Sequence, residues 1–327
     1  MTGVPAPVKK EDILDKITVG ISACLLGEKV RYDGGHKHDR YITDTLGQFF
    51  DYVPVCPEVE YGLPVPREAM HLADNVDDPR LVTVRTCIDH TEGMKKWAGK
   101  KLDELSRRGL SGYIFKSKSP SSGMRGVKVY MGSSPPVHRG VGIFANAFMK
   151  RFPLMPVEDE GRLHDPGLRE NFIERVFVLK RWQDYLEKDG TAGGLVGFHS
   201  DHKLLVMAHS PRHLTTLGRL AAGSKNTPAH PGSLYIETMM EGLRLIATSR
   251  KNTNVLHHIM GYFKKELSGE EKRELLDIID RYHRGLIPLV VPVTLLNHYA
   301  LKYDKTYLKR QHYLNPHPVE LMLRNHV

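Results

Sequence analysis

The chain has little cysteine and no long hydrophobic run. Only three of its 327 residues are cysteines (Cys24, Cys56 and Cys87), too few for a disulfide framework. No segment approaches the run of about 18 apolar residues that can span a bilayer. Residues 1–16 are polar and include Asp12 and Asp15, so they do not resemble a secretory signal. These absences predict a cytoplasmic protein without a membrane partner, in which cysteines more often serve metals or catalysis.

The remaining composition is that of an ordinary globular protein, with 40% hydrophobic and 26% charged residues. The net charge of +9 is spread unevenly. Residues 171–327 hold 22 Lys and Arg against 15 Asp and Glu, a net charge of +7. This excess favours a polyanionic partner such as RNA, although a basic solvated surface explains the charge equally well.

The order of predicted elements divides the chain into two domains. Strands are predicted at 17–22, 51–56, 81–85 and 112–116, with a helix over 91–108. This alternation indicates an α/β domain with a mostly parallel sheet and flanking helices. Helical periodicity follows, for example over 234–249 and 270–284, and indicates an all-α domain. We therefore expect a leader at 1–16, an α/β domain at 17–155, a linker at 156–168 and a helical domain at 169–327.

Three motifs in the first half carry the candidate chemistry: SACLLG at 22–27, VCPE at 55–58 and KSKSPSSG at 116–123. Each motif begins near the end of a predicted strand. Because the carboxyl ends of parallel strands meet at one edge of a sheet, Cys24, Cys56 and Ser122 are expected to converge. Cysteine thiolates are the soft ligands of iron–sulfur clusters, although free cysteines are also often buried as small hydrophobic residues.

With RYDGG at 31–35 and GLPVPR at 62–67, these motifs resemble the thiouracil desulfidase family (TudS). The second half resembles a helical domain fused to it in the bacterial tRNA 4-thiouridine desulfidases (RudS). The resemblance implies conversion of 4-thiouridine in tRNA to uridine with release of sulfide. It also implies a 4Fe–4S cluster with one open iron, held by three cysteines at the positions of Cys24, Cys56 and Ser122.

Ser122 departs from the family, whose third motif contains Ser-Pro-Ser-Cys-Gly. A hydroxyl has a far higher pKa than a thiol and is a hard, neutral ligand, so we expect poor iron binding and little or no activity. Cys87 lies outside the family's motifs and is expected to pack rather than to replace the lost thiolate. The chain is either a Cys→Ser form of an active enzyme or a natural form that has lost its cluster.

Further site residues follow from the same motifs. Glu58 is the expected catalytic acid/base, since a carboxylate beside an open iron could deprotonate the attacking water. Ser119 is expected to orient the water or to hydrogen-bond the pyrimidine. The residues expected to bind substrate are Arg31, Asp33, Arg67, Ser117 and Lys118, the last of them facing a phosphate. The alternatives are a surface glutamate, serines that cap turns, and structural ion pairs.

The second half mixes cations with aromatic residues between Tyr299 and Tyr313, a pattern that suits RNA. The residues expected to bind RNA are Lys203, Arg212, Lys305, Lys309 and Arg310. A solvated amphipathic tail is the alternative. Four histidines, His199, His202, His209 and His213, lack the additional ligands that a metal site would need, and are expected to form a polar, basic face.

Two other functions remain open. One is a desulfidase of free thiopyrimidines or of 4-thio-UMP, and the other is a cluster-free RNA-binding protein. No obligate protein partner is inferred from the sequence.

Overall fold

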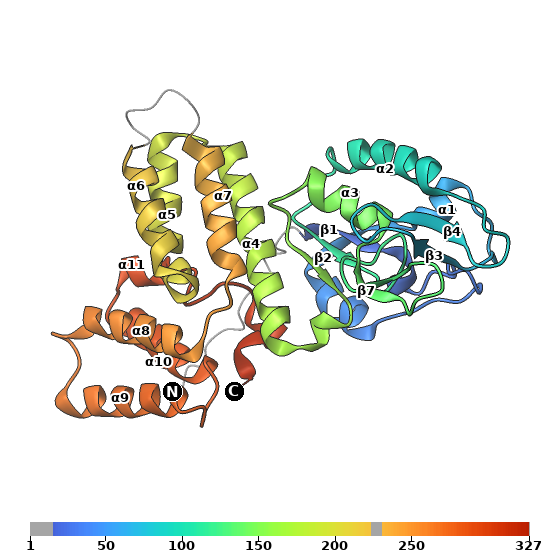
Figure 1. Cartoon of the computed structure of the whole chain (residues 1–327). Helices are drawn as coiled ribbons and strands as arrows, with labels where there is room; N and C mark the ends of the chain where they lie inside the picture. Colours follow the sequence, from blue (N-terminus) through green and yellow to red (C-terminus); the bar gives the residue numbers. More distant parts are fainter. Residues whose placement is uncertain (1–15, 224–230, 327) are drawn as a thin grey trace, which may run out of the picture. The chain divides into compact units, whose positions relative to one another are not determined.

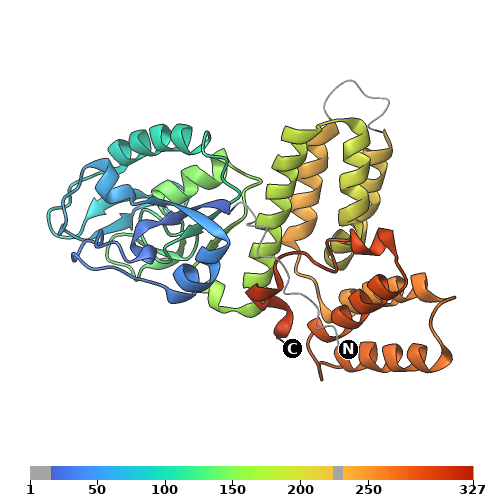
Figure 2. The same cartoon turned by 180° about the vertical axis from the view of Figure 1, so that it is seen from behind.

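The computed structural model describes residues 16–223 and 231–326, so residues 1–15 of the expected leader lie outside the described residues. The chain divides into two compact units, Met1–Phe148 and Met149–Val327. Figures 1 and 2 show them from opposite sides.

A parallel sheet forms the centre of the first unit. Strand β1 (Ile17–Ser22) lies between β2 (Phe50–Val55) and β5 (Gly112–Phe115), and it is parallel to both. All but one residue of β1 is buried, as expected for a strand covered on both faces. Gly20 is needed in this strand, because a Cβ there would lie 2.3 Å from the ring of Tyr113. The α/β class predicted for this half is confirmed.

A second, mixed sheet accompanies the first. It consists of β3 (Met70–Ala73), β4 (Arg80–Thr83), β6 (Val127–Tyr130) and β7 (Val137–Gly140), in the order β4-β3-β6-β7. Only β3 and β6 are parallel in it. The strand predicted at 81–85 forms β4 and pairs antiparallel with β3. It therefore does not join the parallel sheet. The sequence could not show this, because a short apolar run predicts a strand but not the strand with which it pairs.

Helices and short helical turns complete the first unit. Helix α2 (Thr91–Leu105) buries Met94, Ala98 and Leu102, and α3 (Ile143–Arg151) packs Phe144 and Phe148 against the rings of β5. The shorter elements are η1 (Ala23–Leu26), η2 (Tyr41–Thr45), η3 (Leu46–Gln48) and α1 (Pro57–Tyr61).

The second unit is helical after a short strand. Its first part contains β8 (Val157–Asp159), η4 (Arg162–His164), α4 (Pro166–Lys188), α5 (Ala192–His209), α6 (Pro211–Gly223) and α7 (Pro231–Arg244). Helices α4 to α7 lie side by side in both views. The segment expected to be a linker, 156–168, thus holds β8, η4 and the first turn of α4.

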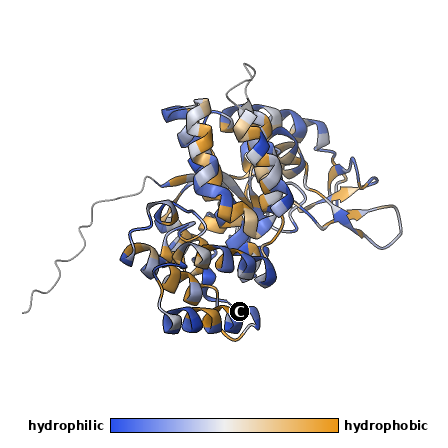
Figure 3. Cartoon of the chain, turned by 90° about the vertical axis from the view of Figure 1, so that its left-hand side faces the viewer, coloured by the Kyte–Doolittle hydropathy of each residue, from blue (hydrophilic) through white to orange (hydrophobic). Residues whose placement is uncertain are grey.

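The second part of this unit contains α8 (Ser249–Met260), η6 (Gly261–Phe263), α9 (Gly269–His283), α10 (Val290–Lys302), α11 (Thr306–Lys309), η7 (Val319–Leu321) and η8 (Leu323–Asn325). One hydrophobic core runs through both parts, and Figure 3 shows hydrophilic and hydrophobic residues mixed along the helices. Among the described residues, no helix is long and apolar enough to cross a membrane.

Two details of the helical prediction are wrong. The helix predicted over 234–249 ends at Arg244, and the side chain of Thr248 caps the next helix by accepting a hydrogen bond from the amide of Lys251. Helical spacing in the sequence predicts Leu186 on the same buried face as Phe172, Val176 and Leu179, but it is 53% exposed. It lies in the last turn of the helix, beyond Trp182, the last buried residue of that helix.

Candidate active site at the ends of the parallel strands

A cavity of about 430 Å³ in the first unit is lined by all three motifs. Cys24 lies in η1 directly after β1, and Cys56 caps the start of α1 directly after β2. Ser122 lies in the loop that follows β5. Since these strands are parallel neighbours, their carboxyl ends share one edge of the sheet, and the structure brings the three residues together there.

Glu58 is held from both sides within this cavity. The hydroxyl of Ser121 donates a hydrogen bond of 2.6 Å to Oε1, and Oε2 lies 3.5 Å from Sγ of Cys56 and 3.7 Å from the guanidinium of Arg67. The Glu58 side chain is 13% exposed. It is therefore not the surface glutamate that was the alternative.

The thiol of Cys56 is strongly perturbed. Burial, followed by the charge of Glu58, raises the pKa of Cys56 to about 12. The thiol also points to the carbonyl oxygen of Val30, at 3.7 Å. In the absence of a metal this cysteine is a protonated hydrogen-bond donor at neutral pH.

Arg67 provides an unpaired donor at the cavity. One terminal nitrogen donates to the carbonyl of Val30 at 3.0 Å, and its side chain is 6% exposed. Its Nε is buried without a hydrogen-bond partner among the described residues. A buried N–H of this kind is costly unless a ligand or water satisfies it, which fits a role in substrate binding.

The third motif forms a tight turn around Ser119. The Ser119 hydroxyl accepts from the backbone N–H of Ser122 at 3.1 Å and lies 3.0 Å from the hydroxyl of Ser121. A Cβ at Gly123 would lie 2.7 Å from the carbonyl oxygen of Ser119, so this turn requires glycine. Ser119 therefore caps the turn, and this contact also fixes the position of its hydroxyl on the cavity wall.

Of the other residues expected to bind substrate, three line the cavity and one does not. Arg31, Ser117 and Lys118 line the cavity, and Lys118 has a φ of 60°, which non-glycine residues rarely adopt. Asp33 does not line it. Its carboxylate pairs with Arg31 at 3.4 Å and accepts from the amide of Gly35, and these contacts lower the pKa of Asp33.

Comparisons with known proteins match the two halves separately. Residues 19–160 match the family described as 2-thiouracil desulfurase, and residues 203–318 match a family described as protein of unknown function DUF1722. The uncharacterized protein YbgA of Escherichia coli strain K12 is 32% identical over 159 residues, which are 48% of this chain and 94% of YbgA. This chain belongs to the 2-thiouracil desulfurase family and carries a DUF1722 domain.

Among solved structures, the 4Fe-4S-dependent thiouracil desulfidase TudS is similar to the chain. The sequence identity is 30% and the TM-score is 0.38, with 46% of this chain and 95% of that chain covered.

The ligand set of the desulfurase domain is one thiolate short. Cys24 and Cys56 line the cavity with Ser122. Cys87 lies outside the lining in the segment after β4, and because it is exposed, the expectation that it packs is wrong. In the described part of the chain, no group of three His, Cys, Asp or Glu side chains could hold a metal. Two thiols and a hydroxyl do not fit a cluster that needs three thiolates, and a cysteine at position 122 would complete the set.

Several residues of the site were missed from the sequence. Lys37 and Lys116 add positive charge to the cavity wall. Ser121 does not line the cavity, but its hydroxyl binds Glu58 directly. Lys116 and Ser121 belong to the KSKSPSSG motif, so their place in the motif was a signal. No sequence signal indicated that Ser121 would reach Glu58, 63 positions away.

The four histidines of residues 199–213 do not form the expected polar, basic face, because His202 and His209 are buried with 2% exposure each. His199 meets the hydroxyl of Tyr235, His202 the carbonyl of Phe198, and His213 the hydroxyl of Ser210. Arg212, expected to bind RNA, is exposed at the start of α6.

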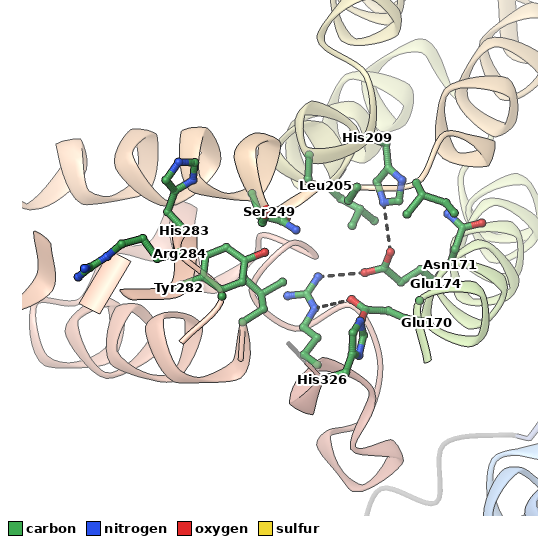
Figure 4. Close-up of a pocket in the computed structure, with 18 residues that line it drawn as sticks. Glu170, Asn171, Glu174, Leu205, His209, Ser249, Tyr282, His283, Arg284 and His326 are labelled. Carbon is green, nitrogen blue, oxygen red and sulfur yellow. Dashed lines mark hydrogen bonds and ion pairs between the residues drawn. The ribbon is translucent and has the colours of Figure 1, made fainter. Parts of the chain in front are cut away.

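His209 belongs to a second cavity, of about 460 Å³, within the helical unit (Figure 4). There Arg324 pairs with Glu170 at 3.3 Å and with Glu174 at 2.9 Å. Both ring nitrogens of His209 face acceptors, namely Glu174 at 3.1 Å and the carbonyl of Leu245 at 2.6 Å. These buried charges satisfy one another and fasten the C-terminal segment to α4.

Proposed function

We propose that this protein is built to convert 4-thiouridine in tRNA to uridine with release of sulfide. The observation that carries the proposal is the Glu58 carboxylate, fixed by Ser121 beside Cys56 in a cavity lined by the three desulfurase motifs. The match of residues 19–160 to the 2-thiouracil desulfurase family supports the same reaction class.

The reaction is a hydrolysis in which no electrons are exchanged. Water adds to the ring carbon that bears sulfur, the carbon–sulfur bond breaks, and oxygen remains on the carbon while sulfur leaves as hydrogen sulfide. Glu58 would take a proton from the water and return it to the departing sulfur. Ser119 would orient the water, and Arg67 and Lys118 would bind the pyrimidine and a phosphate.

The cofactor would be a 4Fe–4S cluster held by Cys24, Cys56 and a thiolate at position 122. Such a cluster would supply a Lewis-acidic iron for the thiocarbonyl sulfur. Because Ser122 leaves the ligand set incomplete, we expect the chain with serine to be inactive or nearly so.

The decisive test compares the Ser122 protein with Ser122→Cys after anaerobic reconstitution. The cysteine form is expected to bind about four iron and four sulfide per chain. It is also expected to release sulfide from tRNA that contains 4-thiouridine. A full cluster and equal turnover in the serine form would contradict this account of position 122.

Two alternatives have their own support. Every residue that lines the cavity belongs to the first unit, which favours a free thiopyrimidine or 4-thio-UMP as substrate. Equal kcat/KM for 4-thio-UMP and thiolated tRNA in the Ser122→Cys protein would select this alternative. The incomplete ligand set favours a cluster-free RNA-binding protein, which would bind tRNA but gain no activity from the cysteine.

A further inference from the structure

The cations expected to bind RNA near the C-terminus are already paired with carboxylates. Lys305 pairs with Glu266, Lys309 with Asp304, and Arg310 with Asp201. A phosphate would have to compete with these acids for each cation. The positive charge of this segment is therefore largely neutralised where it lies.

Helix α8 and the turn after it carry cations without acids. The sequence has no Asp or Glu between Glu241 and Glu266. Val255, Leu256, Ile259 and Phe263 face the core. The exposed residues include Arg250, Asn254, His257 and His258, which recur at helical spacing along one side of α8, and Lys264 and Lys265, which follow in the turn. Within the described ranges, neither Arg250 nor the two lysines forms an ion pair.

A row of rings extends from the same helix. His258 meets Tyr262 edge to face, with ring centroids 5.7 Å apart, and Tyr262 stacks on Tyr307 of α11 at 5.3 Å. The ammonium of Lys203 lies 5.0 Å from the centre of the Tyr307 ring. His258 is exposed and both tyrosines are half-buried, so the row reaches the surface at the basic side of α8.

We infer that this surface, the α8 face (Arg250, Asn254, His257, His258, Lys264 and Lys265 with the rings of Tyr262 and Tyr307), is the RNA-docking surface of the DUF1722 domain. Unpaired cations attract phosphates, and residues 242–265 contribute no acid that would repel a polyanion. The exposed ring of His258, at the end of the row, offers a surface on which an unpaired base can stack, and an aromatic ring beside cations is typical of RNA recognition. That the RNA is tRNA rests on the proposed function.

The test compares two triple variants of the full chain that remove the same charge. One is Arg250→Gln/Lys264→Gln/Lys265→Gln, and the matched control is Lys305→Gln/Lys309→Gln/Arg310→Gln. Binding to an unmodified tRNA transcript is measured by fluorescence anisotropy across a range of salt concentrations. In the first variant the slope of log K against log salt should fall by about 2 to 3, with affinity at least about tenfold lower at low salt. The control variant should show a clearly smaller decrease in both the slope and the affinity.

Equal losses of RNA affinity in both triple variants would mean that only net charge matters, and would overturn the inference. An unchanged salt slope in the Arg250→Gln/Lys264→Gln/Lys265→Gln variant would also overturn it. His258→Ala tests the rings without changing buried residues. It should weaken binding to the transcript but not to heparin, which has phosphate-like charge without bases. An equal loss on heparin, or no loss on RNA, would mean that the face does not recognise RNA.

The transcript contains no thiouridine, and binding requires no cluster. A failure of the proposed reaction would therefore appear as absent sulfide release with intact, α8-dependent RNA binding. A failure of this inference would appear as unchanged RNA binding in the α8 variant, whatever the activity.

Discussion

The orientation of a few side chains decides what the cavity of the desulfurase domain can do. Glu58 has one oxygen held by Ser121 and the other directed to Cys56 and Arg67. A carboxylate fixed in this way is oriented for proton transfer before substrate arrives. Glu58 is therefore the residue whose replacement should separate chemistry from cluster binding.

In the Ser122→Cys background, Glu58→Gln should retain the iron and sulfide content and the absorption spectrum of the cluster. Turnover should fall by about 10²-fold or more, which is typical of the loss of a general base. Sulfide release under anaerobic conditions measures the rate. Glu68→Gln, at another glutamate that lines the cavity, is the control. A near-normal rate in Glu58→Gln would remove this residue from the mechanism.

At the scale of elements, α4 joins the C-terminal segment through an unequal pair of carboxyl groups. Burial, followed by the charge of Glu174, raises the pKa of Glu170 to about 7. Burial alone would also raise the pKa of Glu174, but the hydrogen bond to His209 and the charge of Arg324 outweigh it and lower this pKa to about 2. The two residues are one helical turn apart and yet should affect stability in opposite directions.

The pH dependence follows from the sign of each shift. The contribution of Glu174 is present above its ordinary pKa of 4.5 and is lost as the pH falls towards 2. The contribution of Glu170 is present below 4.5 and is lost as the pH rises through about 7. Glu174→Gln at pH 7 should therefore lower the free energy of unfolding by about 3 to 5 kcal/mol, as expected when one partner of a buried ion pair is removed.

Glu170→Gln is the matched comparison and should lower the free energy of unfolding much less than Glu174→Gln does. This loss should become smaller still between pH 5 and pH 8. Urea unfolding followed by Trp182 fluorescence measures both, with Trp97→Phe as background so that only the helical unit reports. Equal losses in the two variants at pH 8 would show that the carboxyl groups do not differ as their surroundings indicate.

At the scale of the whole molecule, the cavity of the desulfurase domain and the α8 face belong to different units. A large substrate such as tRNA can use both, whereas a free nucleotide needs only the cavity. Salt screens phosphate contacts on the α8 face and should leave the small substrate largely unaffected. The two substrates should therefore respond differently to ionic strength.

In the Ser122→Cys protein, raising salt from about 50 to about 200 mM should lower kcat/KM on thiolated tRNA by about tenfold or more. The same change should alter kcat/KM on 4-thio-UMP by less than about twofold. The α8 triple variant should lose most of the salt sensitivity on tRNA while keeping its rate on the nucleotide. Parallel salt curves for the two substrates would place all substrate contacts in the first unit.

The sequence by itself determined the motifs, the change from alternating strands and helices to helices alone, and the missing thiolate. These are local properties, because periodicity and motif spacing depend only on residues that are close together in the sequence. It also placed Cys24, Cys56 and Ser122 near strand ends, from which their meeting could be expected once the sheet was taken to be parallel.

Only the tertiary structure decided which side chains are paired and which are free. Lys305 and Arg310 find Glu266 and Asp201 at separations of 39 and 109 positions, and Ser121 reaches Glu58 across 63. In the part of the chain that the structure describes, Arg250, Lys264 and Lys265 of the α8 face meet no such acid. Charge and burial depend on neighbours that packing brings together. The basic segment 305–310, predicted from the sequence to bind RNA, is therefore neutralised by acids, whereas the α8 face, which the sequence analysis did not single out, keeps its charge.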